Sequence, residues 1–112
     1  MSKMTKPTTD NKLDNFRQRV LMAVYAIPFG KVATYGEIAK QAGSVKSARQ
    51  VGGILKHLPA DSKLPWFRVV NRFGKLSLIG DEYQCQYHAL KAEGIVFSEN
   101  DTIDLQLFGW FI

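Results

Sequence analysis

Apolar residues recur at helical spacing in the first third of the chain. From residue 13 an apolar side chain returns every three or four positions, which places one apolar stripe on one face of a helix. Pro28 and Gly30 follow this stripe, and both residue types end helices. The pattern therefore predicts a first helix whose core-facing residues are Leu13, Phe16, Val20, Leu21, Val24 and Ile27.

Two shorter amphipathic segments come next. In "ATYGEIAKQAG", Thr34 precedes the apolar positions and Glu37 lies three residues later, which is the spacing of a capping box. Gly43 lies where a glycine commonly ends a helix. The segment "SARQVGGILKHL" has small and apolar residues at positions i, i+3, i+4 and i+7, which predicts a core-facing side made of Ala48, Val51, Gly52 and Leu55.

The short link "SVK" joins these two segments, which predicts a helix-turn-helix arrangement. A glycine on an outer helix face costs about 1 kcal/mol relative to alanine. Two explanations are open for such a glycine at position 53: a partner approaches its backbone closely, or the helix packs against another element through Gly52 and Gly53. The other residues of that outer face are mostly basic, and the whole face comprises Arg49, Gln50, Gly53, Lys56 and His57.

The second half of the chain has shorter elements. Residues 59–65 are a predicted loop, "FRVV" a predicted strand, and "NRFGK" a turn in which Gly74 takes a positive φ. "LSLIGD" is a short strand or a loop. Asp81 is expected to cap a last long helix that Gly94 ends, and a closing hairpin and an aromatic tail follow. The core-facing residues of that helix are Tyr83, Tyr87 and Leu90.

This order of elements predicts an α+β fold that is mostly helical. A chain of 112 residues is typical of one domain and can bury a core without disulfides. Residues 1–11 are polar, and we expect them to be a disordered lead-in. Residues 12–112 are expected to form the single domain.

The charge is unevenly distributed. Residues 1–75 hold 14 Lys and Arg against 4 Asp and Glu, a net charge of +10, whereas residues 76–112 hold 1 Lys against 6 acids, a net charge of −5. A strongly basic segment favours binding to an anion, and nucleic acid is the leading candidate. A solvated basic surface without a partner is the other interpretation.

Compartment and membrane signals are few. No apolar run approaches the roughly 20 residues of a membrane-spanning helix, and the polar first ten residues do not resemble a signal peptide. The single cysteine, Cys85, allows no internal disulfide and suits a reducing compartment. We expect a cytoplasmic monomer that associates with the nucleoid when bound to DNA.

Few residues can support catalysis by themselves. The His and Cys residues lack the spacing of a zinc site, and no phosphate-binding loop or dinucleotide fingerprint is present, so we expect neither a metal nor a cofactor. Cys85 is interpreted as a structural residue. The remaining candidates are Tyr35 at a helix N-terminus, where backbone N–H groups favour phosphate, Arg49, and residues 65–71.

Three motifs together resemble a known family. "TYGEIA", "SARQVGGIL" and "PWFRVVNRFG" occur in the order and at the separations of the DNA-binding, active-site domain of O6-alkylguanine-DNA alkyltransferases. The resemblance covers residues 12–97 and implies a winged helix-turn-helix-like domain similar to the C-terminal domain of those enzymes.

The catalytic pair of that family is replaced in this chain. The family pattern is P-C-H-R-V, in which the Cys takes the alkyl group and the His, with a distant Glu, activates it. Trp66 stands at the Cys position and Phe67 at the His position, while Glu93 stands at the Glu position. A Trp at the Cys position resembles the alkyltransferase-like proteins, although these commonly have "PWHRV", so Phe67 departs from them. The resemblance implies that this chain is not an enzyme.

The resemblance also implies roles for individual residues. Arg49 corresponds to the arginine that fills the hole left by a flipped base, and Tyr35 to the tyrosine that turns the 3′ phosphate. Trp66 is expected to wall the base pocket, and Leu58 occupies the position of a hinge Asn. The implied lesion pocket consists of Tyr35, Trp66, Val69 and Gly80, with Gly80 in the lid and the backbone near Val69 contacting the guanine edge. The implied DNA contacts are Tyr35, Ala48, Arg49, Gly52, Gly53, Lys56 and Arg68.

The function implied is that of a DNA damage sensor. It would bind O6-alkylguanine in double-stranded DNA from the minor groove, flip the base without transferring the alkyl group, and flag the site to nucleotide excision repair proteins. It would also compete with alkyltransferases for lesions. Two alternatives stay open: a winged-helix regulator that binds a specific sequence, and a residual alkyltransferase that uses Cys85.

Overall fold

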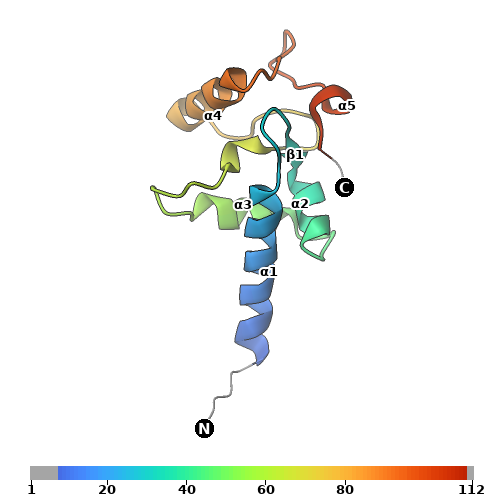
Figure 1. Cartoon of the computed structure of the whole chain (residues 1–112), viewed down its shortest axis with the longest axis vertical. Helices are drawn as coiled ribbons and strands as arrows, with labels where there is room; N and C mark the ends of the chain where they lie inside the picture. Colours follow the sequence, from blue (N-terminus) through green and yellow to red (C-terminus); the bar gives the residue numbers. More distant parts are fainter. Residues whose placement is uncertain (1–7, 111–112) are drawn as a thin grey trace.

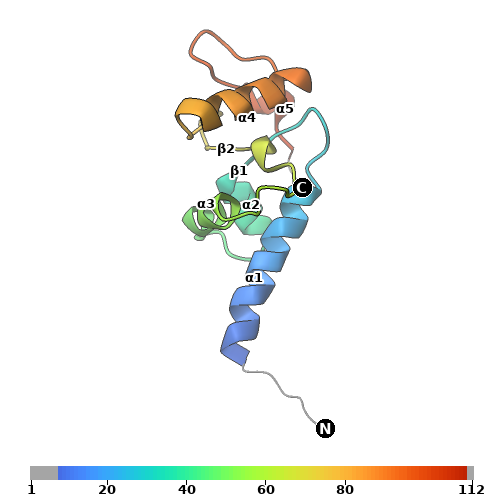
Figure 2. The ribbon, with the colours of Figure 1, turned by 90° about the vertical axis from the view of Figure 1, so that its left-hand side faces the viewer.

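A very short parallel sheet separates two helical layers. In the computed structural model, which describes residues 8–110 and the side chains from residue 15, the helices α1 to α3 lie on one side of the sheet and α4 and α5 on the other (Figures 1 and 2). The elements in chain order are α1 (Thr8–Tyr25), β1 (Ala33–Thr34), α2 (Tyr35–Gln41), α3 (Ala48–Lys56), the 3-10 helix η1 (Trp66–Arg68), β2 (Val69–Val70), α4 (Gly80–Ala92) and α5 (Leu105–Phe108).

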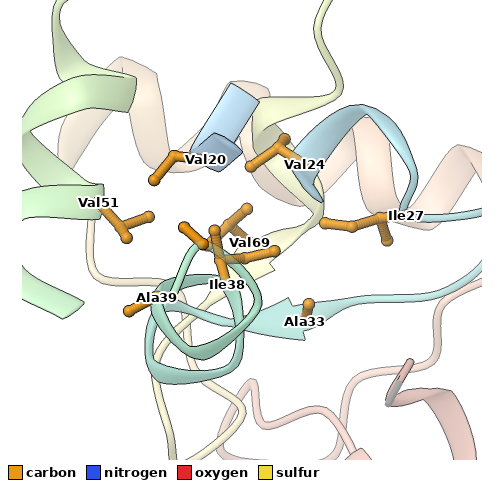
Figure 3. Packing of buried hydrophobic residues seen from close by; sticks show 9 residues of the cluster. Val20, Val24, Ile27, Ala33, Ile38, Ala39, Val51 and Val69 are labelled. Carbon is orange, nitrogen blue, oxygen red and sulfur yellow. The ribbon is translucent and has the colours of Figure 1, made fainter. Parts of the chain in front are cut away.

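The sheet connects two hydrophobic cores. Ala33 pairs with Val69 in parallel register, and Thr34 pairs with Val70. Because successive side chains of a strand point to opposite faces, Val69 belongs to the core under α1, α2 and α3, whereas Val70 belongs to the core under α4. Figure 3 shows the first core, in which Val69 packs with residues from α1, the segment that follows it, β1, α2 and α3: Val20, Val24, Ile27, Ala33, Ile38, Ala39 and Val51.

Helix α1 packs on the first core through the part of the predicted stripe that begins at Phe16, and the Leu13 side chain lies outside the described residues. Its buried residues Val20 and Val24 pack on the first core, and Ile27 follows them just beyond the helix. The N-terminal part of α1 extends away from the rest of the chain (Figure 1). The helix begins at Thr8, so residues 8–11, which the sequence suggested as disordered, are helical; these polar residues gave no periodic signal. Residues 1–7 of the expected lead-in lie outside the described residues.

The helix-turn-helix prediction for residues 34–57 is confirmed. The Thr34 hydroxyl accepts a hydrogen bond from the Glu37 backbone N–H at 3.1 Å, which caps α2 as expected. In α3, Val51 is fully buried and Leu55 packs against the core, whereas Ala48 and Gly52 are only half-buried. The side of α3 that bears these two small residues is therefore partly open.

Two details of the segment 66–81 differ from the sequence prediction. "FRVV" is not a four-residue strand, because Trp66 to Arg68 form a 3-10 turn after Pro65 and only Val69–Val70 pair with β1. Asp81 does not cap α4, since the helix begins at Gly80 with Ile79 as its N-cap. Asp81 lies in the first turn instead, where its negative charge interacts favourably with the positive end of the helix dipole.

The C-terminal part closes the second core. Gly94 has a φ of +90°, and the Ile95 N–H donates to the Leu90 carbonyl at 3.1 Å, the arrangement predicted for the end of α4. The predicted hairpin is confirmed as a Phe97–Ile103 antiparallel bridge. The short helix α5 that follows was not predicted.

Gly74 is required where the hairpin meets the preceding turn. Its φ is +78°, and a β-carbon there would overlap the Ile103 carbonyl. The Ile103 N–H also donates to the Gly74 carbonyl at 2.8 Å. The backbones are therefore too close for any side chain at position 74.

Candidate nucleic-acid interface

A cavity of about 820 Å³ opens between the two helical layers, beside α3. Its walls come from the start of α2, one side of α3, the loop 58–62, the first residue of η1, and residues 77–86. Six of the residues predicted from the sequence line it: Tyr35, Ala48, Arg49, Gly52, Lys56 and Trp66. The tertiary structure thus brings together motifs that are up to 31 residues apart in the chain.

Tyr35 joins the helix-turn-helix to the opposite wall. As the first residue of α2 it is placed by the Thr34 cap. Its hydroxyl lies 3.4 Å from the Ser77 hydroxyl, in the loop before α4. This long hydrogen bond is exposed, and an exposed neutral contact of this length is weak. A ligand can therefore separate Tyr35 from Ser77 at little cost.

The glycines of α3 are not required by the packing of the protein itself. A β-carbon at Gly53 would meet no atom within 4 Å, and one at Gly52 would lie 3.8 Å from the Tyr35 ring, an ordinary contact. Of the two explanations for Gly53, packing against another element is therefore excluded. Each glycine costs about 1 kcal/mol of helix stability relative to alanine. In return, the small residues on this face leave the backbone of α3 accessible.

Trp66 and Phe67 face different surroundings although they are adjacent. Trp66 lines the cavity, whereas Phe67 packs against the second core. Their rings meet edge to face, with centroids 5.9 Å apart. Trp66 therefore presents an apolar wall to the cavity, and Phe67 is removed from it.

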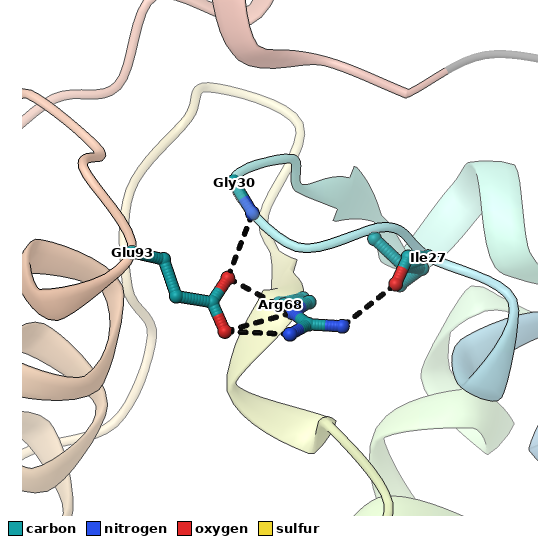
Figure 4. A network of polar contacts seen from close by, with 4 residues as sticks. All are labelled: Ile27, Gly30, Arg68 and Glu93. Carbon is teal, nitrogen blue, oxygen red and sulfur yellow. Dashed lines mark hydrogen bonds and ion pairs between the residues drawn. The ribbon is translucent and has the colours of Figure 1, made fainter.

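Arg68, one of the residues that the resemblance implies as DNA contacts, does not line the cavity. Its guanidinium forms a two-pronged ion pair with Glu93, with an Nη2–Oε2 distance of 2.6 Å and an Nε–Oε1 distance of 2.9 Å (Figure 4). Arg68 also donates to the Ile27 carbonyl, and Glu93 accepts from the Gly30 N–H. The side chains of Arg68 and Glu93 are 15% and 7% exposed, and each of the three guanidinium nitrogens already donates to an acceptor inside the protein.

Two further predicted pocket residues are placed differently. Val69 is 1% exposed, its N–H donates to the Trp66 carbonyl, and its own carbonyl accepts from Gln86. Its backbone is thus already engaged inside the protein. Gly80 starts α4 but does not line the cavity, and the residues just before it, Ser77 to Ile79, supply that wall. Gly53 lies on the exposed surface of α3 beside the cavity.

Several cavity residues were not predicted from the sequence. Glu82, Cys85 and Gln86 reach the cavity from α4, and residues 58–60 and 62 form its outer rim. Cys85 is exposed and has no disulfide partner. The one signal that could have found Gln86 is its polarity within the apolar stripe between Tyr83 and Leu90.

Other kinds of site find no support among the residues that the structure describes. Residues 8–110 contain no cluster of three or more His, Cys, Asp or Glu side chains that could hold a metal ion. Within the same part of the chain, no helix combines the length and apolarity needed to cross a membrane.

Comparison with solved structures agrees with this architecture. The chain superimposes on Schizosaccharomyces pombe Atl1 in complex with damaged DNA containing O6-carboxymethylguanine, with a TM-score of 0.80 and 38% identity over 88% of this chain and 97% of that one. It also superimposes on Mycobacterium tuberculosis O6-methylguanine methyltransferase, with a TM-score of 0.64 and 36% identity. That match covers 84% of this chain but 55% of the enzyme.

Sequence comparisons point the same way. The chain is 57% identical over 99 residues to the DNA base-flipping protein of Escherichia coli, which covers 88% of this chain and 77% of that protein. It is 44% identical over 86 residues to alkyltransferase-like protein 1 of S. pombe, which covers 75% and 80% respectively. The model of the 6-O-methylguanine DNA methyltransferase DNA-binding domain matches residues 15–95. With the same fold and the same motif order, the chain belongs to the 6-O-methylguanine DNA methyltransferase DNA-binding domain family.

Proposed function

We propose that this protein is a non-enzymatic sensor of alkylated DNA. It binds double-stranded DNA at an O6-alkylguanine, receives the flipped base in the cavity, and leaves the alkyl group in place. The observation that carries the proposal is an open cavity beside α3 whose wall has an indole, Trp66, at the position of the family's acceptor thiol. Two relatives support the proposal: the E. coli relative is named a DNA base-flipping protein, and the S. pombe relative Atl1 was solved in complex with damaged DNA.

Helix α3 is the proposed minor-groove element. Ala48, Gly52 and Gly53 add little or no side chain, which lets the helix backbone approach a narrow groove. Arg49 fills the space that the flipped base leaves, and Lys56 pairs with phosphate. The net charge of +10 on residues 1–75 supplies the salt-dependent attraction to DNA.

Tyr35 and Trp66 are the proposed contacts of the base and its phosphate. Tyr35 turns the 3′ phosphate from the start of α2. Flipping costs a few kcal/mol, and an aromatic contact with a base contributes roughly 1–3 kcal/mol. Trp66 therefore offsets part of the flipping cost while removing the nucleophile.

The absence of alkyl transfer follows from side-chain chemistry. Transfer by the family's route needs a thiolate and a base that activates it, and neither an indole nor a phenyl ring can act as either. Glu93 keeps its position but is held by Arg68. Trp66→Cys is therefore expected not to create an efficient transferase, since Phe67 provides no base. Rapid methyl uptake by that variant, followed by mass spectrometry, would refute this account.

A gel-shift titration tests the proposed function. Two duplexes of identical sequence, one with a single O6-methylguanine, are compared at fixed salt. The lesion duplex should bind at least tenfold more tightly, because a modified base is easier to unpair and fits the apolar wall. Equal affinity for both duplexes, with dependence on the surrounding sequence, would instead support a winged-helix regulator.

Residual transfer to Cys85 is a second candidate, because Cys85 lines the same cavity as Trp66. Transfer to Cys85 predicts that the protein gains the mass of one methyl group per molecule after incubation with O6-methylguanine DNA. Cys85→Ser is the control, since it removes the thiol with little change in volume. We expect no gain in either protein.

The proposed consequence of binding is recruitment of nucleotide excision repair proteins. A bound, unrepaired lesion marks the site, and the acidic segment 76–112, with a net charge of −5, is the proposed surface for a repair partner. Incision of the lesion duplex by a reconstituted excision system should rise when this protein is added. An unchanged or lower rate would argue against recruitment.

A further inference from the structure

Gln86 is a polar residue in an apolar setting. It is 2% exposed and is the only fully buried polar side chain in the part of the chain that the structure describes. It lies on α4 three residues after Tyr83 and four before Leu90, on the face that packs against the second core. Packing alone would favour an apolar side chain at this position, because burying an amide is costly unless it is hydrogen-bonded.

The side-chain amide of Gln86 holds the turn that carries Trp66. Its Nε2 donates to the Phe67 carbonyl and to the Val69 carbonyl, each at 3.0 Å. An amide NH₂ group has two N–H donors, so both are used and the group has one orientation. Gln86 thereby connects α4 to the middle residue of η1 and to the first residue of β2.

The same turn forms part of the cavity wall. Trp66 is the first residue of η1, and its carbonyl accepts from the Val69 N–H. Both Trp66 and Gln86 line the cavity. A displacement of the Phe67 and Val69 carbonyls therefore moves the backbone from which the Trp66 indole projects.

We propose that Gln86 is a positioning residue for the flipped base, because it fixes the turn that sets the Trp66 indole in place before DNA binds. The inference rests on the proposed function, since it assumes that the base enters this cavity. A wall that is already ordered lowers the cost of ordering on binding. Gln86 acts through the turn and need not touch the base.

The first test measures the ratio of dissociation constants for a guanine duplex and a matched O6-methylguanine duplex. Gln86→Met keeps the side-chain length but removes both donors, and should lower this ratio about fivefold or more while changing the affinity for the guanine duplex less than twofold. Gln86→Asn keeps an amide on a side chain one methylene shorter, which can reach at most one of the two carbonyls, and should lower the ratio less than Gln86→Met does. The matched control is Gln84→Met, on the exposed side of the same helix.

Specific outcomes would overturn the proposal. It fails if folded Gln86→Met keeps the wild-type ratio, or if Gln84→Met lowers the ratio as much as Gln86→Met. If Gln86→Met does not fold, Gln86→Asn replaces it, since its shorter side chain cannot reach both carbonyls.

A second test uses the protein without DNA and so separates this inference from the proposed function. In a Trp110→Phe background Trp66 is the only tryptophan. Gln86→Met should increase acrylamide quenching of Trp66 fluorescence at least twofold, whereas Gln84→Met should not. Unchanged quenching in Gln86→Met would refute the positioning role, whether or not the wild-type protein prefers the lesion duplex. Increased quenching in a wild-type protein that shows no lesion preference would refute only the proposed function.

Discussion

The turn at residues 65–70 has two sides with opposite characters. On one side Trp66 faces an open cavity of about 820 Å³, whose walls are joined by the exposed 3.4 Å contact between the Tyr35 and Ser77 hydroxyls. On the other side Arg68 is locked by Glu93 and the Ile27 carbonyl, beside a smaller hollow of about 460 Å³. Of the two residues that depart from the P-C-H-R-V pattern, Trp66 lies on the open side, whereas Phe67 packs against the second core.

We propose that this difference lets the site lack the transfer chemistry of the enzymes and keep the shape of the turn. Trp66 and Phe67 stand where the resemblance places the Cys and the His of the family pattern, while Arg68 and Val69 match the Arg and Val that follow. Those retained residues are the ones that pack and pair inside the protein. Substitution on the cavity side therefore leaves the internal support of the turn intact.

The largest effect is expected on the locked side. Glu93→Ala leaves the Arg68 charge nearly buried without its partner, which typically costs about 3–5 kcal/mol. Urea unfolding should show a lower midpoint, with Glu99→Ala, an exposed acid in the hairpin turn, as the control. A loss below about 1 kcal/mol would mean that the pair contributes no more than a surface salt bridge.

A smaller effect, on binding alone, is expected on the open side. Arg49→Ala removes the side chain proposed to fill the hole in the duplex, and the flipping cost of a few kcal/mol is then less well offset. The preference for O6-methylguanine duplexes should fall at least tenfold, with the free energy of unfolding unchanged. Lys46→Ala, which removes one positive charge from the exposed link before α3, is the control. A retained preference would remove Arg49 from the proposed mechanism.

Gly53→Ala should change stability and binding in opposite directions. Because a β-carbon there meets nothing in the protein, alanine should stabilise the fold by roughly 1 kcal/mol. The same methyl group should weaken DNA binding by keeping α3 from the groove. If thermal unfolding and gel shifts both improve, α3 does not make the proposed close approach.

The smallest effect is expected on stability at alkaline pH, from a hydrogen bond in the C-terminal layer that involves neither Trp66 nor Arg68. The Tyr83 hydroxyl donates to Asp101 at 2.9 Å, and this hydrogen bond to the carboxylate raises the pKa of Tyr83 above its ordinary value of 10.0. Its contribution to stability is therefore complete below the unfolded pKa and is lost as pH rises through the higher folded pKa. Tyr83→Phe should remove this alkaline loss without altering lesion preference. Urea titrations between about pH 9 and pH 11 measure it, and an unchanged alkaline slope would contradict it.

Much of the framework could be predicted because its signals are local. The cap at Thr34, the end of α4 at Gly94 and the small residues of α3 depend on neighbours within a few positions. The short helix α5 and the 3-10 form of residues 66–68 were missed, because their conformations depend on contacts with distant parts of the chain.

The sequence by itself determined the helix-turn-helix, its basic outer face and the presence of an indole and a phenyl ring at positions 66 and 67, since residue identity decides what a side chain can donate or accept. Only the tertiary structure decided that Trp66 faces a cavity while Phe67 and Arg68 turn away from it. It also decided that Arg68 meets Glu93, 25 residues further along, and that Gln86 holds the carbonyls of the same turn. These contacts join segments far apart in the chain, so the local pattern of residues carries no record of them.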